Sequence, residues 1–169
     1  VGVTKAYISR VGSGPFITEQ KNKIGDYLIE KGAEFGVVTG RRRRCGWLDL
    51  ISLKYSARVN SLTELFITKL DVLSGLEELK LCVGYKNNGE VITDYPYDQN
   101  ILKSAEPVYE IFDGWMDDIS TVKSFEDLPD NAKSYIKAIQ TFVDVPITFI
   151  SVGPETVSYT HLRAHETLQ

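Results

Sequence analysis

The 169-residue sequence lacks the features that mark several classes of protein. It has no uncharged apolar run of about 18 residues, so we expect no membrane-spanning helix. Cys45 and Cys82 are its only cysteines, too few for a disulfide framework, and no signal-like segment opens the chain. We therefore expect a reducing, cytoplasmic setting. The hydrophobic fraction of 43% is too high for a disordered chain and allows a buried core.

Methionine is almost absent as well. Met116 is the only one, and the chain opens with Val1 and Gly2. A translation product starts with methionine unless it is processed. We therefore expect either that an upstream segment was removed or that the sequence is a piece of a longer chain.

Motifs for phosphate and metal binding are incomplete or missing. Gly12 and Gly14 could begin a dinucleotide fingerprint, but Ile17 stands where the third glycine belongs. The chain has no G-x-x-x-x-G-K-[ST] phosphate loop either. His161 and His165 have the spacing of two helical metal ligands, but no glutamate lies between them and no third ligand is evident. We predict no metal site in this chain, and we expect the two cysteines to be small buried thiols.

Charge is unevenly distributed between the two halves. Residues 1–85 hold 13 basic and 9 acidic side chains, a net of +4, whereas residues 86–169 hold 6 and 14, a net of −8. The basic half owes its sign to four consecutive arginines at 41–44. The overall charge of −4 and the lack of a broad basic stripe disfavour a nucleic-acid partner. Four adjacent guanidiniums better fit a compact anion that carries phosphate or carboxylate.

Hydrophobic periodicity predicts an alternation of strands and helices. The predicted strands are residues 3–9, 65–67, 79–85, 90–95, 108–112 and 147–152. The predicted helices are residues 19–31, 47–62, 98–105 and 130–143, and the predicted loops include 10–15 and 34–46. Asp130 is the predicted N-cap of the last helix, and Asn87-Asn88-Gly89 is typical of a β-hairpin. The fold class is therefore α/β with an inserted hairpin, in which ligands bind at the carboxyl ends of strands.

Residues 68–71, Thr-Lys-Leu-Asp, follow a predicted buried strand and suit a guanine base. The Asp71 carboxylate can accept hydrogen bonds from both N1–H and the exocyclic N2–H of guanine, a pair that adenine does not offer. The aliphatic stem of Lys69 can lie along the plane of the base. The alternative is a surface ion pair, because the K-x-D pattern recurs by chance.

Residues 38–44 combine the hydroxyl of Thr39, the flexible backbone of Gly40 and the four arginines. Glycine lets the backbone approach a ligand closely, and each guanidinium can form two parallel hydrogen bonds to a carboxylate or phosphate. The segment therefore suits a small anion. The alternative is a solvated loop or a surface patch for polyanions.

Several stretches resemble, in order, the adenylosuccinate synthetase family. They are residues 1–7, 10–16, 18–19, 34–49, 68–73, 106–109, 114–115 and 151–154. The resemblance implies the C-terminal part of a single-domain, mainly parallel-sheet, P-loop-like ligase fold. It also implies a reaction of purine and AMP biosynthesis, in which GTP phosphorylates the 6-oxygen of IMP. The amino group of L-aspartate then displaces the phosphate, which gives adenylosuccinate and GDP. Members of the family work as homodimers.

The resemblance also implies binding roles. The residues implied to close on aspartate are Val37, Val38, Thr39, Gly40, Arg41, Arg42 and Arg43, and Arg41 is implied to reach IMP as well. The residues implied to bind GTP, the co-substrate, are Arg43, Lys69, Leu70, Asp71, Ser151, Val152 and Gly153. The family's phosphate-binding loop, catalytic residues and Mg²⁺ ligands are expected upstream of Val1. No catalytic residue is therefore assigned here, and we expect the isolated chain to be inactive.

The sequence departs from the family pattern in two places. Val38 stands where many members have threonine, which removes one hydroxyl contact to aspartate although Thr39 remains. Residues 157–169 resemble translated sequencing-adapter read-through, so we expect residues 1–156 to be family sequence and the rest a non-native tail. The alternative function is a non-enzymatic nucleotide- or polyanion-binding module that uses arginines 41–44.

Overall fold

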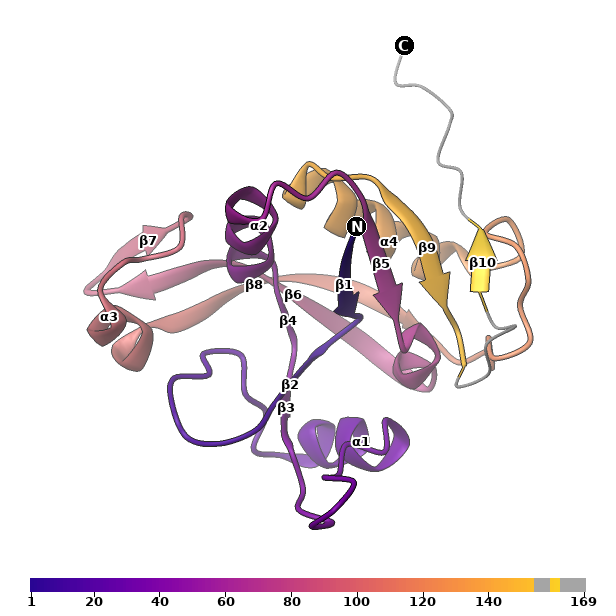
Figure 1. Ribbon diagram of the computed structural model, residues 1–169, viewed down its shortest axis with the longest axis horizontal. Coiled ribbons are helices and arrows are strands. Elements are labelled where there is room, and N and C mark those ends of the chain that lie inside the picture. Colours follow the sequence, from indigo (N-terminus) through magenta and orange to yellow (C-terminus); the bar gives the residue numbers. More distant parts are fainter. Residues whose placement is uncertain (154–158, 162–169) are drawn as a thin grey trace.

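A parallel sheet brings the ends of three strands together in the computed structural model, which describes residues 1–153 and 159–161. The strands of this sheet are β1 (Gly2–Lys5), β5 (Leu65–Thr68), β9 (Ile147–Ser151) and β10 (Tyr159–His161). β1, β5 and β9 are parallel neighbours, and β10 pairs antiparallel with β9 (Figure 1). The carboxyl ends of the three parallel strands therefore meet at one edge, where the α/β class is expected to bind ligands.

The remaining strands form a mainly antiparallel sheet and a two-stranded ribbon. They are β2 (Ile8–Arg10), β3 (Arg44–Gly46), β4 (Leu48–Asp49), β6 (Leu76–Asn87), β7 (Glu90–Ile92) and β8 (Glu106–Trp115). β6 pairs antiparallel with both β7 and β8 and parallel with β4, whereas β2 and β3 pair antiparallel with each other. The predicted hairpin is confirmed, because Asn88 and Gly89 turn the chain between β6 and β7 with positive φ angles of 51° and 86°.

Four α-helices and one 3₁₀ turn connect the described strands. They are α1 (Lys23–Lys31), α2 (Leu50–Val59), α3 (Gln99–Ser104), α4 (Asp130–Val143) and the turn η1 (Leu70–Leu73). Side-chain caps decide where α1 and α2 begin: Asn22 accepts two backbone N–H groups of α1, and Asp49 accepts two of α2. These two predicted helices, at residues 19–31 and 47–62, consequently start later than the periodicity indicated.

Helix α4 packs one face into the core, as its apolar spacing predicted. The buried residues of this face are Ala132, Tyr135, Ile136, Ile139 and Val143. The ring of Tyr135 meets Phe112 and Trp115 of β8 edge-on, with centroid distances of 5.9 and 6.3 Å. Its hydroxyl donates to the backbone carbonyl of Ala6 at 2.8 Å. One side chain thus joins the helix to both sheets.

The predicted strand at residues 3–9 is wrong as a single element. The last bond to the parallel sheet is made by the N–H of Ala6, which donates to Thr68 O at 2.9 Å. The chain then leaves this sheet, and the side chain of Tyr7 is buried. β2 then pairs with β3, so the predicted loop at residues 34–46 ends in a strand. Alternating apolar residues cannot distinguish one strand from two that share a buried turn.

The other boundary differences are smaller. β6 and β8 are longer than the predicted strands because they pair with each other from Leu76 opposite Trp115 to Lys86 opposite Glu106. Asp130 was predicted as an N-cap but is the first residue of α4, and Pro129 takes the cap position. The proline can do so because the N-terminal turn of a helix needs no backbone donor there.

We predict that Tyr135→Phe lowers the free energy of unfolding of the chain by about 1–2 kcal/mol, since it removes the hydrogen bond to Ala6 O within the core. Urea unfolding followed by circular dichroism measures this change. Tyr97→Phe is the matched control, because the Tyr97 side chain is 88% exposed. Equal stabilities of Tyr135→Phe and the unaltered chain would contradict this account of α4.

Candidate functional site

The carboxyl ends of the parallel strands carry the polar side chains of the candidate site. Lys5 is the last residue of β1, and it lies opposite Thr68 at the end of β5. Lys69 follows with φ +60°, a left-handed conformation that lets η1 begin at once. Ser151 ends β9, and its hydroxyl donates to Gly153 O at 2.9 Å. The structure therefore places two of the predicted segments, 69–71 and 151–153, at one edge of the sheet.

A buried carboxylate, Glu34, is the centre of this edge. Its side chain is fully buried and accepts hydrogen bonds from four donors. The distances to Oε1 are 2.6 Å from Lys5 Nζ, 2.7 Å from Tyr7 OH and 3.0 Å from Lys69 Nζ, and the distance to Oε2 is 3.0 Å from Arg43 Nη1. The segment before the arginine run is thereby bonded to β1 and to the turn after β5.

The charges at Glu34 do not cancel. Burial opposes ionisation of the carboxyl, but the hydrogen bonds from Lys5, Tyr7 and Lys69 outweigh it and lower the pKa of Glu34 to about 2. The same burial and the charge of Glu34 raise the pKa of Tyr7, so its hydroxyl stays a donor. One carboxylate therefore faces three cations, each about a third exposed, and the cluster carries excess positive charge that suits an anion.

Two of the four arginines lie against carboxylates that point away from this cluster. Arg42 Nη2 is 2.7 Å from Asp26 and 3.5 Å from Glu30, both on α1. Arg44 makes a two-pronged ion pair with Glu19, with Nε–Oε1 at 2.8 Å and Nη2–Oε2 at 2.6 Å. This pairing lowers the pKa of Glu19. Both side chains are therefore committed to bracing the loop.

Arg41 differs from its neighbours. Within the described part of the chain its exposed guanidinium has no hydrogen-bond or ion-pair partner, while its backbone carbonyl accepts from Gly36 N–H at 2.8 Å and closes the loop. Val37 and Val38, at the tip, are 97% and 96% exposed. Gly40 adopts φ +64°, a left-handed conformation that glycine reaches without strain. The loop thus presents one free cation beside an open tip.

Asp71 presents an unused acceptor. Its Oδ1 is buried without a hydrogen-bond partner among the described residues, and burial raises the pKa of this carboxyl. An unsatisfied buried acceptor costs free energy unless a ligand supplies the donor. Arg43 Nε is likewise buried without a partner. Leu70 lies between the two predicted polar residues of the turn, but its side chain is fully buried in the core, so only its backbone faces the edge.

Sequence reasoning did not identify Glu34, Lys5 or Tyr7 as site residues. The only sequence signal was position: Glu34 opens the Gly- and Arg-rich segment, and Lys5 falls within the first predicted strand. Neither signal shows that a carboxylate will be fully buried, because acidic side chains are mostly exposed.

The structure also bears on the two cysteines, on metal ligands and on membrane-spanning helices. Cys45 and Cys82 are buried and free, which confirms the prediction, and burial raises their pKa values to about 11 and about 12. Within residues 1–153 and 159–161, no three His, Cys, Asp or Glu side chains gather to hold a metal ion. No helix of the described chain is long and apolar enough to cross a membrane. His165 lies outside the described residues.

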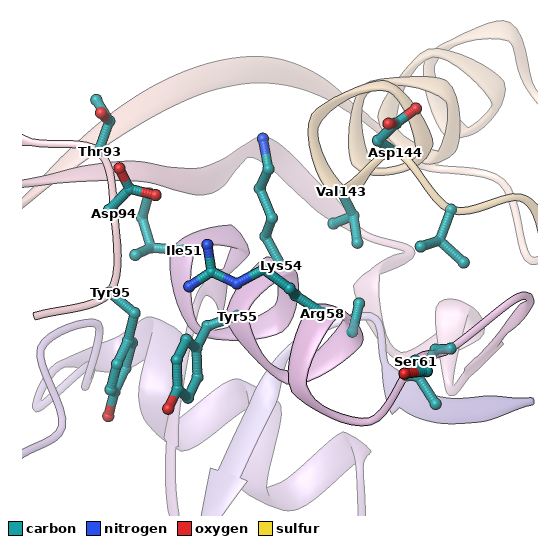
Figure 2. Close-up of a pocket in the computed structure, with 13 residues that line it drawn as sticks. Ile51, Lys54, Tyr55, Arg58, Ser61, Thr93, Asp94, Tyr95, Val143 and Asp144 are labelled. Atoms are coloured by element: carbon teal, nitrogen blue, oxygen red, sulfur yellow. The ribbon is translucent and has the colours of Figure 1, made fainter. Parts of the chain in front are cut away.

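A separate cavity of about 290 Å³ lies beside α2 and contains none of the predicted site residues. Figure 2 shows its aromatic wall, in which Tyr55 and Tyr95 stack with ring centroids 4.7 Å apart. Its cations also lie against rings: the Arg58 guanidinium is 5.6 Å from the centroid of Tyr55. These side chains are engaged in packing, and we therefore place the candidate site at the strand ends.

Comparisons with known proteins show which family the chain resembles. The adenylosuccinate synthetase family model matches residues 1–160. A protein of Caldanaerobacter subterraneus named adenylosuccinate synthetase is 55% identical over 155 residues, which are 92% of this chain and 36% of the relative. One of Yarrowia lipolytica is 55% identical over 153 residues, which are 90% of this chain and 36% of that protein. The solved structure of fully ligated adenylosuccinate synthetase from Plasmodium falciparum is 49% identical, with a TM-score of 0.91 over 95% of this chain and 39% of that one.

Fold and site together define an α/β protein with a cationic cluster at the ends of its parallel strands. The family model and the relatives match most of the chain. The chain therefore belongs to the adenylosuccinate synthetase family. It spans about 36% of the length of the curated relatives it matches. The expected boundary near residue 156 stays a prediction, and of the tail at 157–169 only the backbone of β10 is described.

We predict that acid weakens the fold through Glu34. Its folded pKa, about 2, lies below the ordinary 4.5, so its stabilisation is complete above 4.5 and is lost as the pH falls toward 2. The loss is on the order of 3 kcal/mol. Urea unfolding over this pH range, with Glu34→Gln as the comparison, measures it. The variant should lack this part of the acid sensitivity, and parallel curves for the two proteins would contradict the prediction.

Proposed function

We propose that this chain is the guanine- and aspartate-binding part of an adenylosuccinate synthetase. The whole protein would be a ligase that joins L-aspartate to IMP at the expense of GTP and gives adenylosuccinate, GDP and phosphate. The observation that carries the proposal is the unpartnered buried acceptor of Asp71, two residues after Lys69 of the cationic cluster. Family membership supports the same assignment.

The turn after β5 supports guanine recognition by its unused groups. Asp71 Oδ1 needs a donor, and guanine offers N1–H and N2–H side by side. The ammonium group of Lys69 is held by Glu34 and by Gly32 O, 3.0 and 2.5 Å away, which leaves the aliphatic stem to cover the base. We assign residues 151–153 to the wall of the base pocket, since they follow the neighbouring strand β9.

The arginine loop, residues 37–43, supports binding of a small dicarboxylate. Arg41 is its free cation, and Thr39 and the exposed backbone near Gly40 supply further polar contacts. We assign Arg41 to aspartate and to IMP, and Arg43 to GTP as well as to the loop. Arg42 faces α1 in the structure, so we assign it the role of holding the loop rather than direct contact with aspartate.

The remaining parts of the reaction belong to the rest of the protein. We assign no described residue to Mg²⁺ or to catalysis, because no described acidic or histidine cluster fits a metal ion. The homodimer of the family and the cytoplasmic setting also stay predictions.

The alternative, a non-enzymatic polyanion-binding module, is weaker than the sequence suggested. It needs four free arginines at 41–44, whereas Arg42, Arg43 and Arg44 each contact a carboxylate 2.6–3.0 Å away. Of these four arginines, only Arg41 has no carboxylate partner among the described residues. One free guanidinium is too little for phosphate-backbone binding, which takes many contacts.

Tests of the proposal use a chimera in which residues 1–155 replace the matching 155 residues of the Caldanaerobacter relative. This restores a full-length chain around the described site. The unaltered chimera should form adenylosuccinate from IMP, aspartate and GTP. A folded chimera without this activity would contradict the proposed function.

We predict that Asp71→Asn in the chimera weakens GTP use by about tenfold or more, because the amide repels the N–H donors of guanine. The same variant should favour xanthosine triphosphate, whose 2-oxo group accepts from the amide. Steady-state kinetics with both nucleotides measure the change in preference. Asp94→Asn is the control, since this exposed carboxylate lies beside the separate cavity of Figure 2. Unchanged preference in Asp71→Asn would reject the guanine assignment.

We predict that Arg41→Leu in the chimera raises the KM for aspartate by about tenfold or more, because a charge-assisted hydrogen bond to a carboxylate is lost. Arg58→Leu is the matched control, since it removes an arginine beside the distant cavity of Figure 2. Initial rates at varied aspartate concentration separate the two. Wild-type kinetics for Arg41→Leu would reject the role of the loop.

A further inference from the structure

We propose that Glu34 is a positioning residue for guanine-nucleotide binding, because its one buried carboxylate holds both Arg43 and Lys69 in place. This inference rests on the proposed function, which assigns both cations to GTP. Glu34 bonds to both cations, and we assign it no direct contact with the nucleotide. Its removal should therefore weaken nucleotide binding through the two residues that it orients.

The two carboxylate oxygens of Glu34 bind donors from different segments of the site. Oε2 accepts from Arg43 at the base of the arginine loop, and Oε1 accepts from Lys69 in the turn after β5. These partners are 9 and 35 residues away in sequence. Glu34 and Arg43 are also joined through the backbone, since the N–H of Arg43 donates to Glu34 O at 2.9 Å. The carboxylate thus links the base of the arginine loop directly to the turn after β5.

Lys69 depends on this link for its orientation. Its backbone adopts the left-handed conformation, which is unfavourable for a residue with a side chain. The ammonium group is fixed at two points, Glu34 Oε1 and Gly32 O. With the ammonium drawn toward Glu34, the methylene stem is held beside Asp71 as an apolar surface for the base. Without the anchor the stem is free to rotate into solvent.

Arg43 is oriented in a complementary way. Nη1 is fixed on Glu34 Oε2 at 3.0 Å, and Nε is buried without a partner among the described residues. One edge of the guanidinium is therefore committed to the protein, and the side chain is 31% exposed. Because a guanidinium is planar, fixing Nη1 restricts the directions in which the remaining donors can point.

Glutamine cannot replace this carboxylate. All four partners of Glu34 are donors, three of them cationic, so the NH₂ group of an amide would face a donor on either side. The three cations would also lose their shared counter-ion and repel one another. Glu34→Gln is nearly the same size, so its effect reports charge and hydrogen bonding rather than packing.

The test is Glu34→Gln in the chimera, with GTP as the varied substrate. We expect the KM for GTP to rise by about tenfold or more while kcat changes by less than about threefold, since the reacting groups are not contacted by Glu34. Titration with GDP should show the same loss of affinity without turnover. A KM for GTP and a GDP affinity equal to those of the unaltered chimera would overturn the proposal.

Glu19→Gln is the matched control. Glu19 holds Arg44, the next arginine along, in a two-pronged ion pair, but it has no contact with the turn after β5. A general loss of loop stability would affect both variants, whereas positioning of the nucleotide site would affect Glu34→Gln alone. An equal rise of the KM for GTP in the two variants would also overturn the proposal.

If Glu34→Gln does not fold, Glu34→Asp replaces it. This variant keeps the charge but draws it back by about 1.5 Å, the length of one C–C bond, so it cannot reach Arg43 and Lys69 together. The KM for GTP should still rise about fivefold or more, and an unchanged KM would contradict the proposal. An inactive unaltered chimera would reject the proposed function, whereas an active chimera with the Asp71→Asn effect but no Glu34 effect would reject this inference alone.

Discussion

The buried carboxylate of Glu34 is the interaction on which the arrangement of the candidate site depends. Taking a carboxylate out of water is costly unless charged donors replace the water, and here Lys5, Tyr7, Lys69 and Arg43 do so. These donors come from the end of β1, the segment after it, the turn after β5 and the arginine loop. One group therefore fixes the relative positions of segments that lie up to 35 residues from it in the sequence.

The same principle explains why four consecutive arginines are not equivalent. Arg42, Arg43 and Arg44 each contact a different carboxylate or pair of carboxylates, on α1, at Glu34 and at Glu19. Their pairing leaves Arg41 as the one arginine of the run that has no carboxylate partner among the described residues. A run that looks like a polyanion patch in the sequence thus consists of three paired arginines and one arginine without a partner.

The sequence predicted the α/β class, the hairpin and the apolar face of α4, and it singled out two motifs whose ligand-binding roles stay predictions. The T-K-x-D turn and the arginine run stand at fixed spacing, and Ala132, Tyr135 and Ile139 repeat with helical period. Three features could not be predicted. The break after Lys5 depends on pairing with distant strands, the start of α2 depends on the cap at Asp49, and the role of Glu34 depends on four donors from elsewhere in the chain.

A crystal structure of the chimera with GDP, IMP and aspartate tests the account most directly. We expect guanine N1–H and N2–H on the Asp71 carboxylate, the Lys69 stem along the base, and Arg43 and Lys69 still bonded to Glu34. Aspartate should lie against Arg41. Guanine bound elsewhere, with Asp71 Oδ1 still without a donor, would contradict it.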